Sequence, residues 1–233
     1  MRLGIVGAMA EELALINEEI SGQRVKIKAG KTFYEGIYHG IDIVLTESGI
    51  GKVNAAIATQ ILIDNFQVEG VICTGVAGGL NKKLNTKDIV VSKDVIQHDI
   101  DLSEDGYPLG YIPRLDIREI EADDILVNMA LQAGYKVLGK DKVLLGRILT
   151  GDQFVANDVT AKRLRKEFEG DCVEMEGGAI AQVCYLNNIP FVIIRSISDN
   201  ADSKAPIDYD LFVKDACKNS FLIVMAMIGE IGQ

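Results

Sequence analysis

Short apolar runs alternate along this chain with stretches in which apolar residues recur at helical spacing. The run at residues 2–7 ends in glycine and is typical of a buried strand, whereas Val53, Ile57 and Ile61 recur every four residues and predict a helix over residues 52–65. The same two patterns predict further strands at residues 25–29, 32–38, 41–48, 70–74, 88–95, 143–150, 172–175 and 191–196, and helices at residues 10–20, 122–133, 158–168, 179–187 and 208–228.

The order of these elements favours one layered domain. Strands and helices alternate through most of the chain, so we predict an α/β protein with three α/β/α layers and a central mixed, mostly parallel sheet. No linker or low-complexity segment divides the sequence, and we expect residues 1–233 to form a single domain. We also expect a glycine-rich turn at residues 75–79 and a long functional loop at residues 103–114, which contains two glycines, two prolines and two tyrosines.

The charge of the chain limits its partners. Its 233 residues carry 24 lysines and arginines against 34 aspartates and glutamates, a net charge of −10 that argues against a nucleic-acid partner. No apolar stretch approaches the roughly 18–20 residues of a membrane span. A signal peptide would not tolerate Glu11 and Glu12 so close to the first apolar run. We therefore expect a cytoplasmic protein with no membrane partner.

Metal and cofactor chemistry find little support in the sequence. The four cysteines form no Cys-x-x-Cys pair, and His39 and His98 are the only histidines, so we expect reduced, buried thiols, no metal and no cofactor. The glycines at residues 4–7 lack the Gly-x-Gly-x-x-Gly spacing of a dinucleotide site, and no Gly-x-Ser-x-Gly nucleophile motif is present.

Carboxylates follow three separate predicted strands: Glu12, Glu176 and Asp199. Open α/β sheets bind ligands beyond the carboxyl ends of their strands, so these acids are expected to converge. Each acid alone has an ordinary structural explanation, as a partner for a helix dipole or as a turn residue. Three buried carboxylates together are costly and indicate a functional site. We expect Glu174 to alternate out of phase with Glu176, so that one of the two points away into solvent, and we place Glu176 rather than Glu174 in the site.

Five short blocks of sequence also occur in a fixed order from one end of the chain to the other. They are Gly7-Ala8-Met9-x-Glu11-Glu12, Ser48-Gly49-Ile50-Gly51-Lys52-Val53-Asn54-Ala55-Ala56, Thr74-Gly75-x-Ala77-Gly78-Gly79, Val173-Glu174-Met175-Glu176 and Arg195-x-Ile197-Ser198-Asp199. In these blocks, taken together, the chain resembles the bacterial 5′-methylthioadenosine/S-adenosylhomocysteine nucleosidases, members of the nucleoside phosphorylase superfamily.

The resemblance implies a purine nucleoside phosphorylase-like fold and a hydrolase that cleaves the N-glycosidic bond. Its substrates would be 5′-methylthioadenosine, S-adenosylhomocysteine and also 5′-deoxyadenosine, in methionine salvage and methyl-cycle detoxification. The residue matched to Glu12 is the general base that deprotonates water, that matched to Glu176 holds the ribose hydroxyls, and that matched to Asp199 acts at N7 of adenine.

The resemblance also implies substrate contacts in a homodimer with a shared active site. Phe154 would stack on adenine, and the backbone of Val155 would read the edge of the base. The remaining contacts would come from Met175 against the sugar, from Ala77, Gly78, Arg195 and Ser198, from Met9, Ile50 and Tyr209 around the 5′ substituent, and from Leu102 and Pro113 of the second subunit.

Three positions depart from the family pattern. Val76 stands where the family usually has serine, Asp105 stands where an aromatic residue is usual, and Gly177-Gly178 replaces a more usual alanine or threonine pairing. These departures leave the proposed chemistry intact and bear on its rate and on the preferred 5′ group.

Physical chemistry agrees with this assignment of acids. Cleaving an N-glycosidic bond builds positive charge on the ribose and negative charge on the base, so a carboxylate near the sugar and a protonated acid near the base both assist. A purine nucleoside phosphorylase is a competing hypothesis, although phosphate would need basic groups and no lysine or arginine lies between Arg2 and Arg24. The sequence is also compatible with a futalosine-type nucleosidase and with a non-catalytic adenosine-binding protein.

Overall fold

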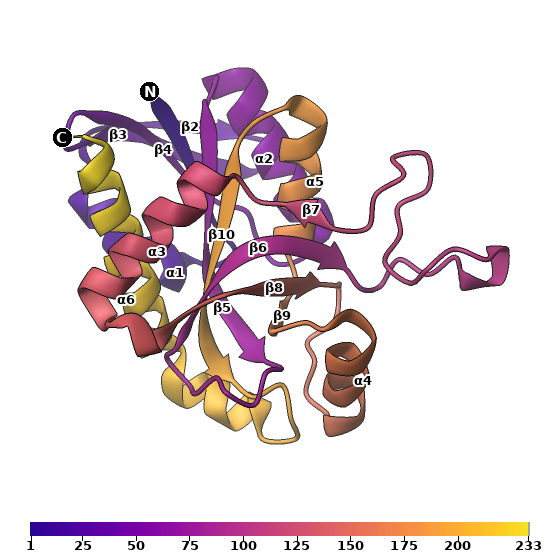
Figure 1. The fold of residues 1–233 in the computed structure, drawn as a ribbon. Helices are drawn as coiled ribbons and strands as arrows, with labels where there is room; N and C mark the ends of the chain where they lie inside the picture. Colours follow the sequence, from indigo (N-terminus) through magenta and orange to yellow (C-terminus); the bar gives the residue numbers. More distant parts are fainter. Residues whose placement is uncertain (233) are drawn as a thin grey trace.

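The structure, a computed structural model, describes residues 1–232, which form one mixed ten-stranded sheet covered by helices (Figure 1). The strands are β1 (Arg2–Gly7), β2 (Ser21–Lys28), β3 (Lys31–Tyr38), β4 (Ile41–Glu47), β5 (Gly70–Gly79), β6 (Ile89–Gln97), β7 (Ile120–Glu121), β8 (Val143–Thr150), β9 (Cys172–Glu174) and β10 (Phe191–Asp199). The helices are α1 (Ala10–Glu19), α2 (Lys52–Phe66), α3 (Asp124–Leu138), α4 (Asp158–Phe168), α5 (Gly177–Asn187) and α6 (Ala205–Ile231), with 3-10 turns η1 (Ser103–Asp105) and η2 (Lys140–Lys142).

The sheet confirms the mixed α/β architecture. Parallel pairs join β4, β1, β5 and β10 at its centre and β6, β8 and β9 beside them. Strands β2, β3 and β4 form an antiparallel meander, and β10 pairs with both β5 and β6. Within the described residues parallel and antiparallel pairs are equally numerous, with the parallel ones carrying the central strands.

Helices cover both faces of the sheet, as the three-layer prediction requires. Helices α1, α3 and α6 pack together on one face, and α2 packs with α5 on the other (Figure 1). The central strands have nearly continuous apolar sequences because a parallel strand between two helical layers is buried on both faces. A second, smaller core lies beneath α4, where Leu164 and Phe168 pack on Leu149 of β8 and Val173 of β9.

The segment at residues 75–79 is strand and not the turn that its glycines predicted. Strand β5 continues through it because Gly75 pairs with Arg195 of β10 and Gly78 pairs with Asp199. A Cβ at Gly75 would collide with the side chains of Arg195 and Glu12, and one at Gly78 would lie 3.0 Å from Asp199 Oδ1. These glycines therefore allow charged side chains to approach the backbone closely.

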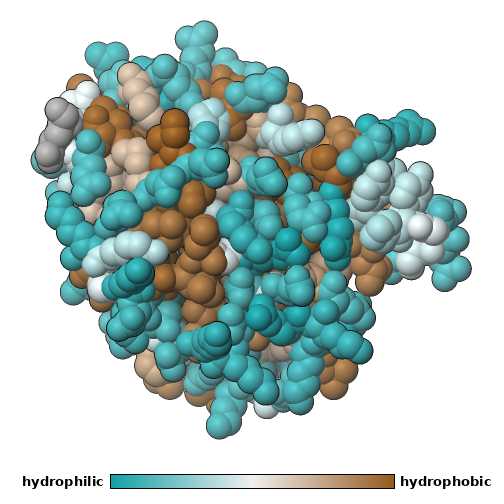
Figure 2. All heavy atoms as spheres, viewed as in Figure 1, coloured by the Kyte–Doolittle hydropathy of each residue, from teal (hydrophilic) through white to brown (hydrophobic). Residues whose placement is uncertain are grey.

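Residues 101–118, here called the arm, project from the body of the molecule between β6 and β7 (Figures 1 and 2). Tyr107 and Tyr111 stack at 5.2 Å, and Ile112 forms a bridge with Ile117, so the arm is held by its own contacts. It contains the long loop predicted from the sequence. Leu102 and Pro113 lie in it, away from the cavity described below.

Three further features concern the cysteines, the start of α4 and the membrane. All four cysteines are free and buried, as predicted. The side chain of Asn157 accepts a hydrogen bond from the Thr160 N–H and caps α4. Among the described residues, no helix has the length and apolarity needed to cross a membrane.

Candidate active site

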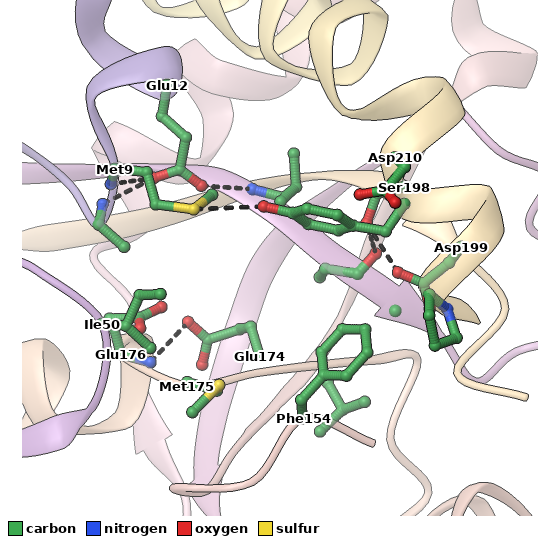
Figure 3. A pocket seen from close by; sticks show the side chains of 17 residues that line it. Met9, Glu12, Ile50, Phe154, Glu174, Met175, Glu176, Ser198, Asp199 and Asp210 are labelled. Carbon is green, nitrogen blue, oxygen red and sulfur yellow. Dashed lines mark hydrogen bonds between the residues drawn. The ribbon is translucent and has the colours of Figure 1, made fainter. Parts of the chain in front are cut away.

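A cavity of about 520 Å³ opens beyond the carboxyl ends of β1, β5, β9 and β10 (Figure 3). Met9 and Glu12 lie across it from Met175 and Glu176, while Ser198 and Asp199 close a third side. Its lining is Ala8, Met9, Glu12, Ile50, Val76, Ala77, Gly78, Phe154, Val173, Glu174, Met175, Glu176, Ser198, Asp199, Pro206, Tyr209 and Asp210.

Glu12 lies in the first turn of α1 with its carboxylate turned back into the cavity. Its Oε2 accepts hydrogen bonds from the Ala8 N–H at 2.6 Å and the Met9 N–H at 3.1 Å, and its Oε1 accepts one from the Val76 N–H at 3.0 Å. Burial raises the pKa of Glu12, and the charge of Arg195 and the three backbone donors oppose that rise. The group is therefore held rigidly and is more basic than an exposed glutamate.

Asp199 is the last residue of β10 and is almost completely buried. Its Oδ2 accepts a hydrogen bond from the Ser198 hydroxyl at 2.8 Å, and its Oδ1 accepts one from the Ala201 N–H at 2.8 Å. Burial raises the pKa of Asp199, and these two donors moderate the shift. A buried aspartic acid of this kind can hold a proton at a pH where an exposed one has lost it.

Glu176 lies between β9 and α5, on the side of the cavity opposite Glu12. Its Oε1 accepts a hydrogen bond from the Gly51 N–H at 2.8 Å, which ties it to the start of α2. Burial, together with the negative charge of Glu174, raises the pKa of Glu176 to about 7. It can therefore change its ionisation near neutral pH.

Glu174 does not point into solvent, so that prediction was wrong. It is buried, it forms an ion pair with Arg195, and it accepts hydrogen bonds from the Thr150 hydroxyl and from the Glu176 and Gly177 N–H groups, at 3.1 and 2.7 Å. Residues two positions apart on a strand lie on the same face, and β9 ends at Glu174. Strand alternation therefore gives no reason for Glu174 to point away from Glu176. It lines the cavity beside Glu176.

Apolar side chains form the remaining walls. The Tyr209 hydroxyl lies 3.2 Å from the Met9 sulfur, and the Tyr209 ring meets the Phe154 ring edge to face at 6.1 Å. Ile50 and Phe154 remain 54% and 50% exposed, so both lie at the mouth of the cavity. A flat apolar ligand could be enclosed here between ring and sulfur-bearing side chains.

The structure brings most of the residues predicted from the sequence to this cavity, and four of them lie outside its lining. Val155 is buried in the small core under α4, and only its backbone is left for a ligand. Arg195 lies behind the lining, with its guanidinium against Glu174 and within 3.7 Å of Glu176. Leu102 and Pro113 lie in the arm.

Several lining residues were not named from the sequence as contacts. These are Ala8, Val173, Glu174, Pro206 and Asp210, together with Val76, which was noted only as a departure. Ala8, Val76 and Glu174 are immediate neighbours of predicted site residues and Val173 lies two residues before Met175, so proximity in sequence could have found them. Pro206 and Asp210 reach the cavity from the first turns of α6, and nothing in the local sequence indicates how that helix is placed.

Known proteins with similar sequences and structures place the chain in a family. A family model described as the phosphorylase superfamily matches residues 2–229. A 5′-methylthioadenosine/S-adenosylhomocysteine nucleosidase of Halalkalibacterium halodurans is 41% identical over 232 residues, covering 99% of each chain.

Two solved structures show the same fold over nearly the whole chain. The nucleosidase of that same name from Colwellia psychrerythraea, in complex with adenine, has a TM-score of 0.94 at 41% identity, covering 99% of this chain and 95% of that one. The futalosine hydrolase of Helicobacter pylori has a TM-score of 0.94 at 35% identity, covering 99% and 98%.

Proposed function

This chain belongs to the phosphorylase superfamily, and we propose that it is a nucleosidase that hydrolyses 5′-methylthioadenosine and S-adenosylhomocysteine, and also 5′-deoxyadenosine. Water would attack C1′ of the ribose as the bond from C1′ to the base breaks, releasing adenine and the 5-substituted ribose. Relatives of that name at about 40% identity over the full chain support the proposal.

The observation that carries the proposal is the cluster of three buried acids, Glu12, Glu176 and Asp199, around one cavity with apolar walls. In our proposal Glu12 accepts the proton of the attacking water, since burial raises its pKa and the backbone fixes its position. Asp199 donates a proton to N7 of adenine, so that the base departs neutral. Ionised Glu176 accepts hydrogen bonds from the ribose hydroxyls and stabilises positive charge on the sugar.

The rest of the cavity suits the other parts of such a substrate. We propose that Phe154 stacks on adenine, that the Val155 backbone reads its edge, and that Met175 packs against the ribose. Met9, Ile50 and Tyr209 would enclose the 5′ substituent. The other proposed contacts are Ala77, Gly78, Ser198 and, through Glu174 and Glu176, Arg195.

The acids also argue against phosphate as the nucleophile. Among the described residues that line the cavity five are acidic and none is lysine, arginine or histidine. The nearby guanidinium of Arg195 is already paired with Glu174. A phosphate ion would be repelled, whereas water can be deprotonated by a carboxylate.

A futalosine-type nucleosidase is the second candidate. The structural similarity to the Helicobacter pylori futalosine hydrolase favours it, because a larger 5′ group would need only an open cavity mouth. Ile50 and Phe154 are both half exposed at that mouth, which leaves room for such a group.

One assay separates these possibilities. Free base is followed during incubation with a panel of 5′-substituted adenosines and a futalosine-type nucleoside, each with and without phosphate. We expect rapid release of adenine that is independent of phosphate. Release that required phosphate would indicate a phosphorylase, release only from the futalosine-type substrate would favour the second candidate, and bound nucleoside without release would indicate a binding protein.

We further propose a homodimer in which the arm of one subunit closes the cavity of the other. The arm projects from the body of the molecule (Figure 1), and the exposed Ile50 and Phe154 at the cavity mouth would be covered by a partner. Leu102 and Pro113 would then reach the 5′ substituent. A monomer that kept full activity at high dilution would contradict this arrangement.

The remaining proposals concern the setting of the enzyme. We propose that residues 1–233 act as one domain in the cytoplasm, in methionine salvage and methyl-cycle detoxification. Four free, buried cysteines support a reducing compartment.

A further inference from the structure

The start of α2 is held by a group of three residues that we call the α2 clamp: Lys52, the first residue of the helix, and Asp99 and Asp152 from two separate loops. The Lys52 N–H donates a hydrogen bond to Asp152 Oδ1 at 2.8 Å. The Asp152 N–H donates to Asp99 Oδ2 at 3.0 Å, and the Lys52 ammonium donates to Asp99 Oδ1 at 2.7 Å. Asp99 and Asp152 lie two residues beyond the ends of β6 and β8, so the clamp fixes α2 to the sheet edge that bears the cavity.

The clamp lies one residue away from the donor that holds Glu176. Gly51 is the N-cap of α2 and has φ +94°, a conformation that glycine adopts without strain. Its N–H donates to Glu176 Oε1 at 2.8 Å. A Cβ on Gly51 would lie 3.0 Å from Asp152 Oδ1, so Asp152 also packs directly against this glycine.

Helix α2 has no side chain of its own at the N-cap position to orient this donor. Gly49 and Gly51 both have positive φ, and the cap residue makes no side-chain hydrogen bond. Within the segment, the side-chain amide of Asn54 donates to the Ile50 carbonyl, which lies in the same planar peptide group as the Gly51 N–H and so holds that group from one side. On the other side of Gly51, the two aspartates fix Lys52, and Asp152 packs against the glycine itself, so the direction of the Gly51 N–H depends on these aspartates as well as on Asn54.

We propose that Asp152, supported by Asp99, is a positioning residue for the reaction, acting through the Gly51 N–H to hold the Glu176 carboxylate toward the ribose. The proposal rests on the proposed nucleosidase function. Asp152 also precedes Phe154, which lines the cavity, by two residues.

The test compares Asp152→Ala with Asp152→Asn. Both variants remove the charge, and only the asparagine keeps an oxygen that can accept the Lys52 N–H. We expect Asp152→Ala to raise KM for 5′-methylthioadenosine about tenfold, with a smaller effect on kcat. A tenfold change is the effect expected from the loss of one charge-assisted hydrogen bond. Asp152→Asn should restore most of the affinity.

The pH profile gives a second readout. Glu176 is faced by Glu174 of β9, Arg195 of β10, Glu12 of α1 and Cys73 of β5, which both variants leave in place. The Gly51 N–H lowers the pKa of Glu176, so loss of this donor should move the acidic limb of the activity profile to higher pH in the alanine variant only.

Asp123→Ala serves as the matched control. Asp123 caps α3 by accepting hydrogen bonds from the Ile125 and Leu126 N–H groups, at 3.1 and 2.9 Å, far from the cavity. Loss of this cap should destabilise the protein without changing KM or the pH profile.

Hydrogen exchange makes the test independent of the enzyme assay. We expect the amides of residues 49–52 to exchange faster in Asp152→Ala and not in Asp123→Ala, whether or not the protein is a nucleosidase. If Asp152→Ala folds poorly, Asp99→Ala takes its place. That substitution removes the acceptor of both the Lys52 ammonium and the Asp152 N–H. Unchanged exchange at residues 49–52, or equal kinetic losses in Asp152→Ala and Asp152→Asn, would overturn the proposal.

Discussion

Replacing Asp199 with asparagine tests the chemistry assigned to the leaving group. The substitution should preserve the fold, because the asparagine oxygen can still accept the Ala201 N–H bond that Oδ1 accepts at 2.8 Å. The amide nitrogen would then face Ser198, whose hydroxyl can accept from it and already lies 3.4 Å from the Ala77 carbonyl. What is lost is the proton that burial allows Asp199 to carry.

The expected loss follows from that missing proton. Adenine is a poor leaving group as an anion, and general acid catalysis typically contributes 10²–10⁴-fold, which corresponds to roughly 3–5 kcal/mol of transition-state stabilisation. We therefore expect Asp199→Asn to lower kcat on 5′-methylthioadenosine by about that factor. Binding of the substrate should change much less, because the shape of the cavity is kept.

A substrate whose leaving group needs no protonation supplies the control. A nitrophenyl riboside loses a stable anion and needs no proton from the protein, so Asp199→Asn should keep most of the activity that the parent shows on it. The parent must be shown to accept this substrate, and release of nitrophenolate is followed by absorbance. Equal losses on both substrates would refute the assignment, and Asp199 would then act in positioning or folding.

The other acids of the site support three further predictions. Glu12→Gln should bind an adenosine analogue by calorimetry while losing turnover, because an amide cannot accept the proton of water; comparable losses of affinity and rate would make it a binding residue. Glu176→Gln should flatten the pH dependence of the free energy of unfolding. In the parent, burial raises the pKa of this carboxyl from 4.5 in the unfolded chain to about 7 in the folded protein. Between these two values the folded state binds more protons than the unfolded state, so the free energy of unfolding falls as pH rises. Urea unfolding at pH 5 and pH 8 measures this slope, and an unchanged slope would contradict it. Glu174→Ala should cost about 3–5 kcal/mol in urea unfolding because it removes the nearest carboxylate from buried Arg195 and leaves it Glu176, 3.7 Å away. Glu167→Ala in a surface pair should cost less than about 1 kcal/mol, and equal costs would contradict the ion-pair account.

The elements of the fold could be predicted because they are local. Strand β8 and helix α4 begin and end at the residues that their apolar spacing indicates. The convergence of Glu12, Glu176 and Asp199 was also predictable, since each follows a strand and parallel strands end at one edge. Ligand sites of this kind can be anticipated from the order of strands and acids alone.

Long-range pairing could not be predicted in the same way. The partner of Glu174 is Arg195, 21 positions away on a strand that is not its neighbour in the sheet. Without that pairing, a glutamate near the end of a short strand is expected at the surface, which is why its burial was missed. Gly75 was misread for a related reason, because the side chains that require a glycine there come from α1 and β10.

Two of the departures expected from the family pattern, Val76 and Gly178, can be explained from their contacts. The Val76 N–H donates to Glu12, and any residue except proline provides that donor. At Gly178 a Cβ would lie 2.6 Å from Gln97 Cγ and 2.9 Å from Thr150 Cβ, so this position cannot carry a larger side chain while Thr150 stays where it is. The Gly178 N–H donates to the Thr150 hydroxyl at 2.7 Å, and that hydroxyl donates in turn to Glu174. Thr150 on β8 thus occupies the space that a side chain on α5 would otherwise fill. Its hydroxyl links the backbone of α5 to Glu174, the partner of Arg195.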